Sequence, residues 1–141
     1  MLDVHLNTPL TLDPKGRIML PSRLKGMLEH AASNVLVCIV HREHLRIYTK
    51  PDFKTHVEDP LLGLDSFDPA VERKQRLRLG FAMEVSVDAQ GRLLIPQNLR
   101  ARAGLERDVV LISVAERLEL WDEGRLNAWL DAAMNEEVPR A

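Results

Sequence analysis

Basic side chains recur in a nine-residue segment that the chain uses twice. The segment reads Asp-Pro-Lys-Gly-Arg-Ile-Met-Leu-Pro over residues 13–21 and Asp-Ala-Gln-Gly-Arg-Leu-Leu-Ile-Pro over residues 88–96. The first copy carries Lys15 and Arg17, and the second carries Arg92 at the position of Arg17. Arginine offers a bidentate fork that matches a phosphate or the edge of a guanine. These three bases are therefore the leading candidates for contact with DNA.

Each arginine also follows an aspartate by four residues, which offers a second interpretation. Arg17 can pair with Asp13, and Arg92 with Asp88, to brace the turn between them. The two interpretations are compatible, because a carboxylate can fix the rotamer of an arginine whose outer edge still meets a ligand. The sequence leaves both open.

Other chemistry has little support in the sequence. There is no Ser-His-Asp, Cys-His or P-loop arrangement, and the carboxylates scatter over predicted turns and helix ends. His41 and His44 have a spacing seen in metal sites, but no cysteine and no further histidine lie near them. Cys38, the single cysteine, sits in an apolar run and is expected to be a buried, inert thiol. We therefore predict no catalytic residue, no metal site, no cofactor and no small-molecule substrate.

The repeated segment predicts a turn between two strands. Apolar residues alternate with polar ones before it, at residues 10–12 and 85–87, as in half-buried strands. After it, Ile18 and Leu20 alternate with Arg17 and Met19, and the same holds at residues 92–95, so a second strand is expected to begin at once. A type I turn followed by a left-handed glycine suits the residues in between. We expect a β-hairpin in each half. The residues that shape its turn and end its second strand are Asp13, Gly16 and Pro21 in the first half, and Asp88, Gly91 and Pro96 in the second.

Similar elements are expected to follow in both halves. A short helix begins after each proline, because proline is favoured in the first turn of a helix, and Gly104 ends the second of these helices. Two strands come next in each half, at residues 35–40 and 45–48 and at residues 109–114 and 118–121. Closing helices are expected at residues 52–57 and 123–130, with Leu126, Trp129 and Leu130 on the apolar face of the second.

An insertion separates the two halves. An acidic stretch at residues 58–68 leads into a predicted helix at residues 69–79, which carries four weaker candidates for phosphate contact, Arg73, Lys74, Arg76 and Arg78. The expected organisation is thus a first repeat at residues 1–57, the connection with its basic helix at 58–80, a second repeat at 81–130 and a disordered tail at 131–141. We predict one mainly β fold with short helices, of the α+β class.

The charge of the chain is unevenly distributed. The formal net charge is −2, yet residues 13–25 hold four bases against one aspartate, whereas residues 105–141 hold nine carboxylates against four arginines. Such segregation can build one basic face on an acidic molecule. The longest apolar run covers residues 35–40, far short of the roughly 20 residues that span a bilayer. We expect a cytoplasmic protein without a membrane partner.

Two copies of Asp-x-x-Gly-Arg-x-x-x-Pro, each followed by a short helix and a strand pair, resemble the MraZ family of bacterial transcriptional regulators. The similarity extends from Leu6 to about Leu130, and its specificity lies in the duplication. The resemblance implies a duplicated swapped-hairpin β-barrel of the AbrB and MazE type, in which the two halves of one chain interlock.

The resemblance also implies a function. MraZ proteins form ring-shaped homo-oligomers that bind tandem short repeats in the promoter of the division and cell-wall gene cluster, in association with the nucleoid. The implied contacts to double-stranded DNA are made by Lys15, Arg17 and Arg92. The second copy departs from the first, with Ala89 and Gln90 in place of Pro14 and Lys15, so the first motif is expected to bind more strongly.

A protein-interaction module of the antitoxin-like barrel type is the main alternative. In that case the apolar residues of the last predicted helix would anchor a partner instead of packing in the core. A gel shift with DNA from upstream of the chain's own gene separates the two hypotheses.

Overall fold

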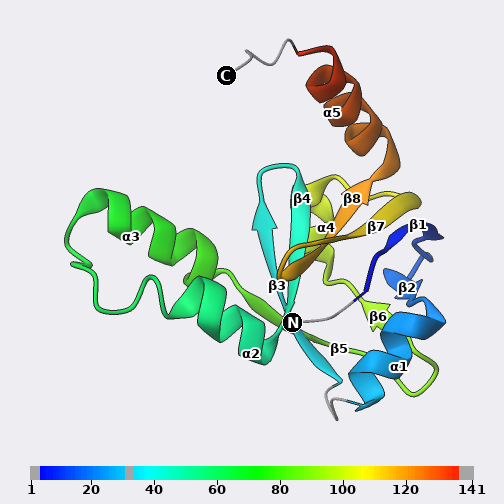
Figure 1. The fold of residues 1–141 in the computed structure, drawn as a ribbon, viewed down its shortest axis with the longest axis horizontal. Helices are drawn as coiled ribbons and strands as arrows, with labels where there is room; N and C mark the ends of the chain where they lie inside the picture. The colour runs from blue at the N-terminus through cyan, green and yellow to red at the C-terminus, as the bar shows by residue number, and fades with distance from the viewer. Residues whose placement is uncertain (1–3, 31–33, 137–141) are drawn as a thin grey trace.

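Six antiparallel strands form the main sheet in the computed structural model, which describes residues 4–30 and 34–136. In pairing order they are β1 (Asn7–Thr11), β7 (Asp108–Val114), β8 (Arg117–Asp122), β4 (His44–Thr49), β3 (Val35–His41) and β5 (Met83–Ser86). A separate two-stranded ribbon consists of β2 (Arg17–Met19) and β6 (Arg92–Leu94). With the short helices around these sheets (Figure 1), the predicted mainly β, α+β class is confirmed.

The strands that flank each turn find their partners in the other half of the chain. β1 pairs with β7, β5 pairs with β3, and β2 pairs with β6. The predicted local hairpins are present only at their turn ends, where the amide of Asp13 donates to the carbonyl of Arg17 at 2.9 Å and Val87 forms a bridge with Leu93. The extended pairing of these strands is with the other half. The physical reason is that alternating polarity fixes which face of a strand is buried and leaves its partner unspecified.

The later strand pairs are local hairpins, as predicted. β3 pairs with β4 and β7 pairs with β8 over six residue pairs each. Their two-residue turns begin at Arg42 and Ala115, both of which have a positive φ, of 58° and 51°. These residues hold equivalent positions in the two halves, so the duplication extends to the backbone conformation of a second pair of turns.

A short helix follows each motif proline. α1 (Ser22–His30) comes directly after Pro21, and α4 (Gln97–Ala103) comes directly after Pro96. Gly104 ends α4 in the left-handed conformation, with φ 65°, as a C-terminal glycine is expected to do. The predicted starts of both helices and the predicted end of the second are confirmed.

The closing helix of the first half and the insertion together form a helical arm, by which we mean residues 50–80. It comprises α2 (Lys50–Phe53), which continues as a π-helix (Lys54–Glu58), and α3 (Pro69–Gln75), which continues as a second π-helix (Arg76–Gly80). Asp68 caps α3 by accepting a hydrogen bond from the amide of Ala70 at 2.9 Å. In Figure 1 the arm extends to the left, on the opposite side of the molecule from β2 and α1.

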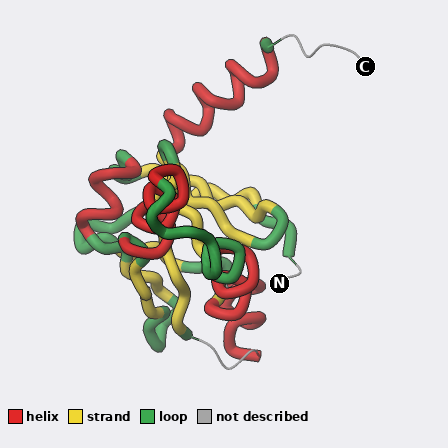
Figure 2. Tube along the Cα trace, turned by 90° about the vertical axis from the view of Figure 1, so that its left-hand side faces the viewer, coloured by secondary structure: helices red, strands yellow, loops and turns green. Residues whose placement is uncertain are grey.

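The last helix is longer than predicted. α5 covers Glu123–Asn135, so residues 131–135 are helical and do not belong to a disordered tail. Residues 137–141, the rest of the expected tail, lie outside the described residues. α5 extends away from the sheets (Figure 2), and no residue in it is buried. The predicted apolar face is present and meets the sheet in part, where the rings of Trp129 and Trp121 lie 6.1 Å apart, while Trp129 stays 53% exposed.

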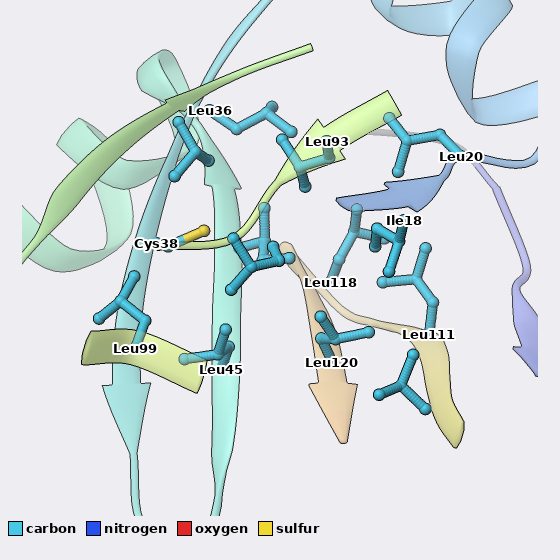
Figure 3. Packing of buried hydrophobic residues seen from close by; sticks show 14 of the residues in the cluster. Ile18, Leu20, Leu36, Cys38, Leu45, Leu93, Leu99, Leu111, Leu118 and Leu120 are labelled. Atoms are coloured by element: carbon cyan, nitrogen blue, oxygen red, sulfur yellow. The ribbon is translucent and has the colours of Figure 1, made fainter. Parts of the chain in front are cut away.

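The core draws on both halves of the chain. Ile18 of β2 and Leu93 of β6 have no exposed surface, and they pack with Leu36, Leu45, Leu111 and Leu120 of the main sheet (Figure 3). Cys38 lies in the same cluster, and burial raises the pKa of its thiol to about 12. A smaller cluster on the other face of β3 and β4 includes Phe53 and Val57 of the arm. None of the described helices is long and apolar enough to cross a membrane.

Candidate nucleic-acid interface

The ribbon of β2 and β6 brings the two motif arginines together. Arg17 is paired with Leu94, and Arg92 is paired with Met19, on either side of the central pair of Ile18 and Leu93. The central pair is fully buried, so the four flanking residues lie on the opposite, outer face of the ribbon. Met19 and Leu94 are about half exposed there. Bases that are 75 positions apart in the sequence thus share one small surface.

An aspartate holds each turn in shape. The Oδ1 atom of Asp13 accepts hydrogen bonds from the amides of Lys15 at 2.9 Å and Arg17 at 2.8 Å. Its Oδ2 atom accepts one from Nε of Arg17 at 2.8 Å. The hydrogen bond from the Arg17 amide is the main reason why the pKa of Asp13 is lowered, and the Arg17 guanidinium adds to this effect. Bracing of the turn by the aspartate is therefore confirmed for the first copy.

The second turn repeats this arrangement. Asp88 accepts from the amides of Gln90 and Arg92 at 2.9 Å each and from Nε of Arg92 at 2.9 Å. Its pKa is lowered for the same reasons, with the Arg92 amide as the largest cause. Both ion pairs use Nε, which is the inner nitrogen of the guanidinium, so bracing is compatible with contact through the outer nitrogens.

Each turn is also held by the other half of the chain. The amide of Leu20 donates to the carbonyl of Gly91 at 3.0 Å, and the amide of Ile95 donates to the carbonyl of Gly16 at 2.8 Å. Both glycines are left-handed, with φ of 88° and 82°. The two turns therefore form one reciprocal unit, and neither is positioned by its own half alone.

Two further basic residues, Arg100 and Lys25, lie against these turns and were not predicted as site residues from the sequence. A Cβ atom on Gly16 would lie 2.6 Å from Nε and Cζ of Arg100, which comes from α4 of the other half. A Cβ atom on Gly91 would lie 2.6 Å from Cδ of Lys25, which comes from α1. The available signal was that each copy of the repeat ends in leucine followed by a base, at Leu24-Lys25 and Leu99-Arg100.

The two turns differ in the charge gathered around them. The first has Lys15, Arg17 and the covering Arg100, whereas the second has Arg92 and the covering Lys25. Nε of Arg100 donates to the carbonyl of Ile95 at 2.9 Å, which fixes this guanidinium in place. The first turn therefore carries one more cation than the second.

The four bases of the arm are not brought to the ribbon. Arg73 and Lys74 lie on α3, and Arg76 and Arg78 lie on the π-helix that continues it, across the molecule from β2 (Figure 1). Arg76 pairs with Glu72 at 3.1 Å. The arm bases therefore form a second basic region, separate from the turns.

The two histidines considered as metal ligands have other neighbours. His44 is buried and stacks on Trp121, with ring centroids 4.4 Å apart. The rings of His41 and His44 meet edge to face, with centroids 5.7 Å apart. Over residues 4–30 and 34–136, no group of three or more potential ligands is placed to hold a metal ion.

Comparison with known proteins shows the family of this chain. A family model described as "MraZ protein, putative antitoxin-like" matches residues 79–138. The Transcriptional regulator MraZ of Coxiella burnetii is 38% identical, over 94% of this chain and 88% of its own length. The proteins of that name from Photorhabdus laumondii and Halorhodospira halophila are each 40% identical, over 86% and 92% of this chain and 79% and 90% of their own lengths. The chain belongs to the MraZ family.

Membership in the MraZ family confirms the resemblance seen in the repeated motif. The family model covers the second copy of the motif only, whereas the MraZ relatives align with nearly the whole chain. Both halves, and the ribbon that they build together, therefore belong to the MraZ-like region.

Proposed function

We propose that this chain is a sequence-specific DNA-binding transcriptional regulator whose role is binding and not catalysis. The observation that carries the proposal is that Arg17 and Arg92 share the outer face of one two-stranded ribbon. Such a ribbon fits the major groove of B-DNA, where arginine pairs with guanine and apolar side chains contact thymine methyl groups. Exposed Met19 and Leu94 lie beside the arginines on this face. Relatives named as transcriptional regulators support the proposal.

The remaining bases of the turns complete the proposed interface. Lys15, Lys25 and Arg100 surround the ribbon and are suited to phosphate contacts, which position a protein on DNA without reading its sequence. With one more cation, the first turn is the stronger contact. Following the family, we propose that the operator consists of tandem short repeats in the promoter of the division and cell-wall gene cluster. We also propose that the protein acts in the cytoplasm, in association with the nucleoid.

The duplicated swapped-hairpin barrel is the fold that suits this function. Its support is the reciprocal pairing of β1 with β7, β5 with β3, and β2 with β6. In this arrangement residues 1–57 and 81–130 act as equivalent repeats. They form one interface because neither half can close its core alone.

The proposed active form is a ring-shaped homo-oligomer. One chain offers only a few phosphate contacts, each of which contributes about −0.9 to the slope of log affinity against log salt concentration. Several chains on one DNA add these contacts, and the later ones become effectively intramolecular. The exposed apolar residues of α5, including Trp129 and Met134, support self-association through this helix.

Removal of the motif arginines tests the DNA interface. Arg17→Ala is expected to weaken binding to a duplex from upstream of the chain's own gene by about tenfold or more, because it removes a bidentate contact. Arg92→Ala is expected to have a smaller effect, since it lies at the turn with fewer cations. Gel shifts measure both effects, and circular dichroism verifies the fold.

Arg76→Ala is the matched control for this test. It removes the same charge from the arm, where Arg76 pairs with Glu72, and is expected to leave the gel shift unchanged. An unaltered shift for Arg17→Ala would contradict the interface. Absence of any shift for the unmodified protein would favour an antitoxin-like interaction module, the second candidate, which the exposed apolar face of α5 also suits.

A charge placed on α5 tests the oligomer. Combined Trp129→Asp and Met134→Asp substitutions are expected to reduce the mass measured by light scattering to that of a monomer. They are also expected to weaken DNA binding by about a hundredfold or more, because avidity is lost. Asn127→Asp adds a charge to the same helix without removing apolar surface, and should keep the oligomer. Full-affinity binding by a monomer would refute the requirement for a ring.

A further inference from the structure

A basic groove of about 590 Å³ lies between the arm, the turn that joins β3 to β4, and α4. The described residues that line it include no carboxylate and five cations: Arg42, Arg73, Lys74, Arg78 and Arg102. Three of the four bases of the arm thus converge on one site with bases from two other elements. The fourth, Arg76, is absent from the lining.

The structure records no counter-charge for this groove among residues 4–30 and 34–136. Among the described residues, none of the five cations forms an ion pair, whereas Arg76 outside the groove pairs with Glu72. His41 also lines the groove, and its pKa is lowered to about 4 by burial first, then by Arg46 outside the groove and His44, and to a smaller extent by Arg42 and Arg78. A concentrated positive potential without counter-charges favours an anionic ligand.

One wall of the groove is apolar. Leu77 and Phe81 line it and are 49% and 64% exposed, and Leu99 adds a buried apolar surface. The volume falls within the range of about 300–1,000 Å³ that is usual for small-molecule sites. An exposed aromatic ring beside several cations is the combination that binds an unpaired base together with its phosphates.

We propose that this groove binds a nucleoside polyphosphate, with the phosphates against the arginines and lysine and the base against Phe81. A nucleotide suits the groove better than duplex DNA does, because the bases of a duplex are already stacked and cannot use the apolar wall. The site is also distinct from the ribbon, because among the described residues neither β2 nor β6 contributes to its lining. Such a ligand is an effector and not a substrate.

The groove and the proposed DNA interface share one helix. α4 carries Arg102 and Asn98 into the groove, while Arg100 of the same helix covers Gly16 in the first turn. An effector in the groove would therefore lie one helix away from the DNA contacts. Its binding does not depend on them, so the test below is independent of the proposed DNA function.

Calorimetric titration of the full chain with ATP and GTP tests the site. Both are expected to bind, and the Arg73→Gln and Arg78→Gln substitutions are each expected to weaken binding by about tenfold, because each removes a charge-assisted hydrogen bond. Phe81→Ala is expected to weaken nucleotide binding by about fivefold or more and to leave inorganic tripolyphosphate unaffected, because only the stacked base is lost. Arg76→Gln is the matched control and should bind as the unmodified chain does.

Four results would overturn the proposal. The first is no binding of either nucleotide at millimolar concentration, and the second is equal weakening by Arg76→Gln, which indicates non-specific charge attraction. The third is tripolyphosphate binding as tight as that of ATP, with no effect of Phe81→Ala, which indicates an anion patch only. The fourth is loss of the gel shift in the Arg73→Gln and Arg78→Gln variants to the extent seen with Arg17→Ala, which assigns these bases to DNA. Circular dichroism of each variant verifies its fold.

Discussion

Replacement of Gly16 by alanine is expected to lower the free energy of unfolding by about 3 kcal/mol, from two separate causes. Gly16 has a φ of 88°, which an alanine adopts only with strain. The new Cβ atom would also lie 2.6 Å from the guanidinium of Arg100, which must move away and lose its hydrogen bond to the carbonyl of Ile95. Urea unfolding at matched protein concentration measures the loss.

Gly63→Ala separates the two causes. Gly63 has a φ of 83°, close to that of Gly16, but a Cβ atom there would have no neighbour within 4 Å. In this variant only backbone strain is expected to lower the free energy of unfolding, by about 1 kcal/mol. Equal losses for Gly16→Ala and Gly63→Ala would show that the cover of the turn by Arg100 contributes nothing to stability.

The same substitution has a consequence for DNA binding. Because Arg100 is displaced from the first turn, Gly16→Ala is expected to weaken the gel shift, whereas Gly63→Ala, on the arm, is expected to leave it unchanged. Unaltered DNA binding by a folded Gly16→Ala protein would remove Arg100 from the proposed interface and leave the motif arginines in it.

The second large effect is expected at Glu119, a buried glutamate on β8, the strand that lies between β7 and β4. Its Oε1 atom accepts from Nε1 of Trp121 at 2.9 Å, and its Oε2 atom lies 2.8 Å from Nη2 of Arg117 and 3.5 Å from Nε2 of His44. Burial alone would raise the pKa of Glu119, but His44, Trp121 and Arg117 together lower it to about 2. Glu119→Gln is expected to lower the free energy of unfolding by about 3 kcal/mol at neutral pH, because the partly buried Arg117 loses the counter-charge of a buried carboxylate.

This loss should depend on pH in a defined direction. The pKa of Glu119 is about 2 in the folded chain and 4.5 as the reference value, so the folded state favours the ionised form. The stabilisation is therefore fully present above about pH 4.5 and disappears as the pH falls towards 2. Unfolding followed at pH 7, 5 and 3 should show the unmodified chain and Glu119→Gln converging at low pH.

Glu116→Gln is the control for this experiment. Glu116 contacts the same arginine at 3.5 Å, and no other side-chain hydrogen bond to it is recorded among the described residues, so its replacement is expected to change the free energy of unfolding by less than about 1 kcal/mol. A difference between the unmodified chain and Glu119→Gln that stays constant from pH 7 to pH 3 would show that the charge of Glu119 is not what stabilises the fold.

Local features of this chain could be predicted because a few neighbouring residues decide them. Gly16 and Gly91 take the left-handed conformation that their turns require, and the aspartates three residues earlier hold those turns. Each motif proline precedes a helix, and Gly104 ends the second of these helices. Backbone preferences and short-range hydrogen bonds determine such features, so they are present in any sequence window that contains the residues.

The site could be predicted only in part. The motif arginines were recognised because they recur, but the two bases that cover the turns come from helices of the opposite half. The groove is a similar case, because its five cations come from three elements that are separate in the sequence. The repeat marks Lys25 and Arg100 as recurring bases but does not indicate which turn each one covers. The convergence of Arg42 with the arm leaves no signal in local spacing.

The sequence by itself determined the turns, the strands, the starts of the short helices and the family. The tertiary structure alone decided the partners of the strands that flank the two motif turns, the shared face of Arg17 and Arg92, and the exposure of α5. The physical reason is that a strand with alternating polarity can bury its apolar face equally well beside a strand of the same half or of the other half. The choice is made by packing across the whole chain, in which Ile18 and Leu93 lose all their exposed surface against each other and the main sheet.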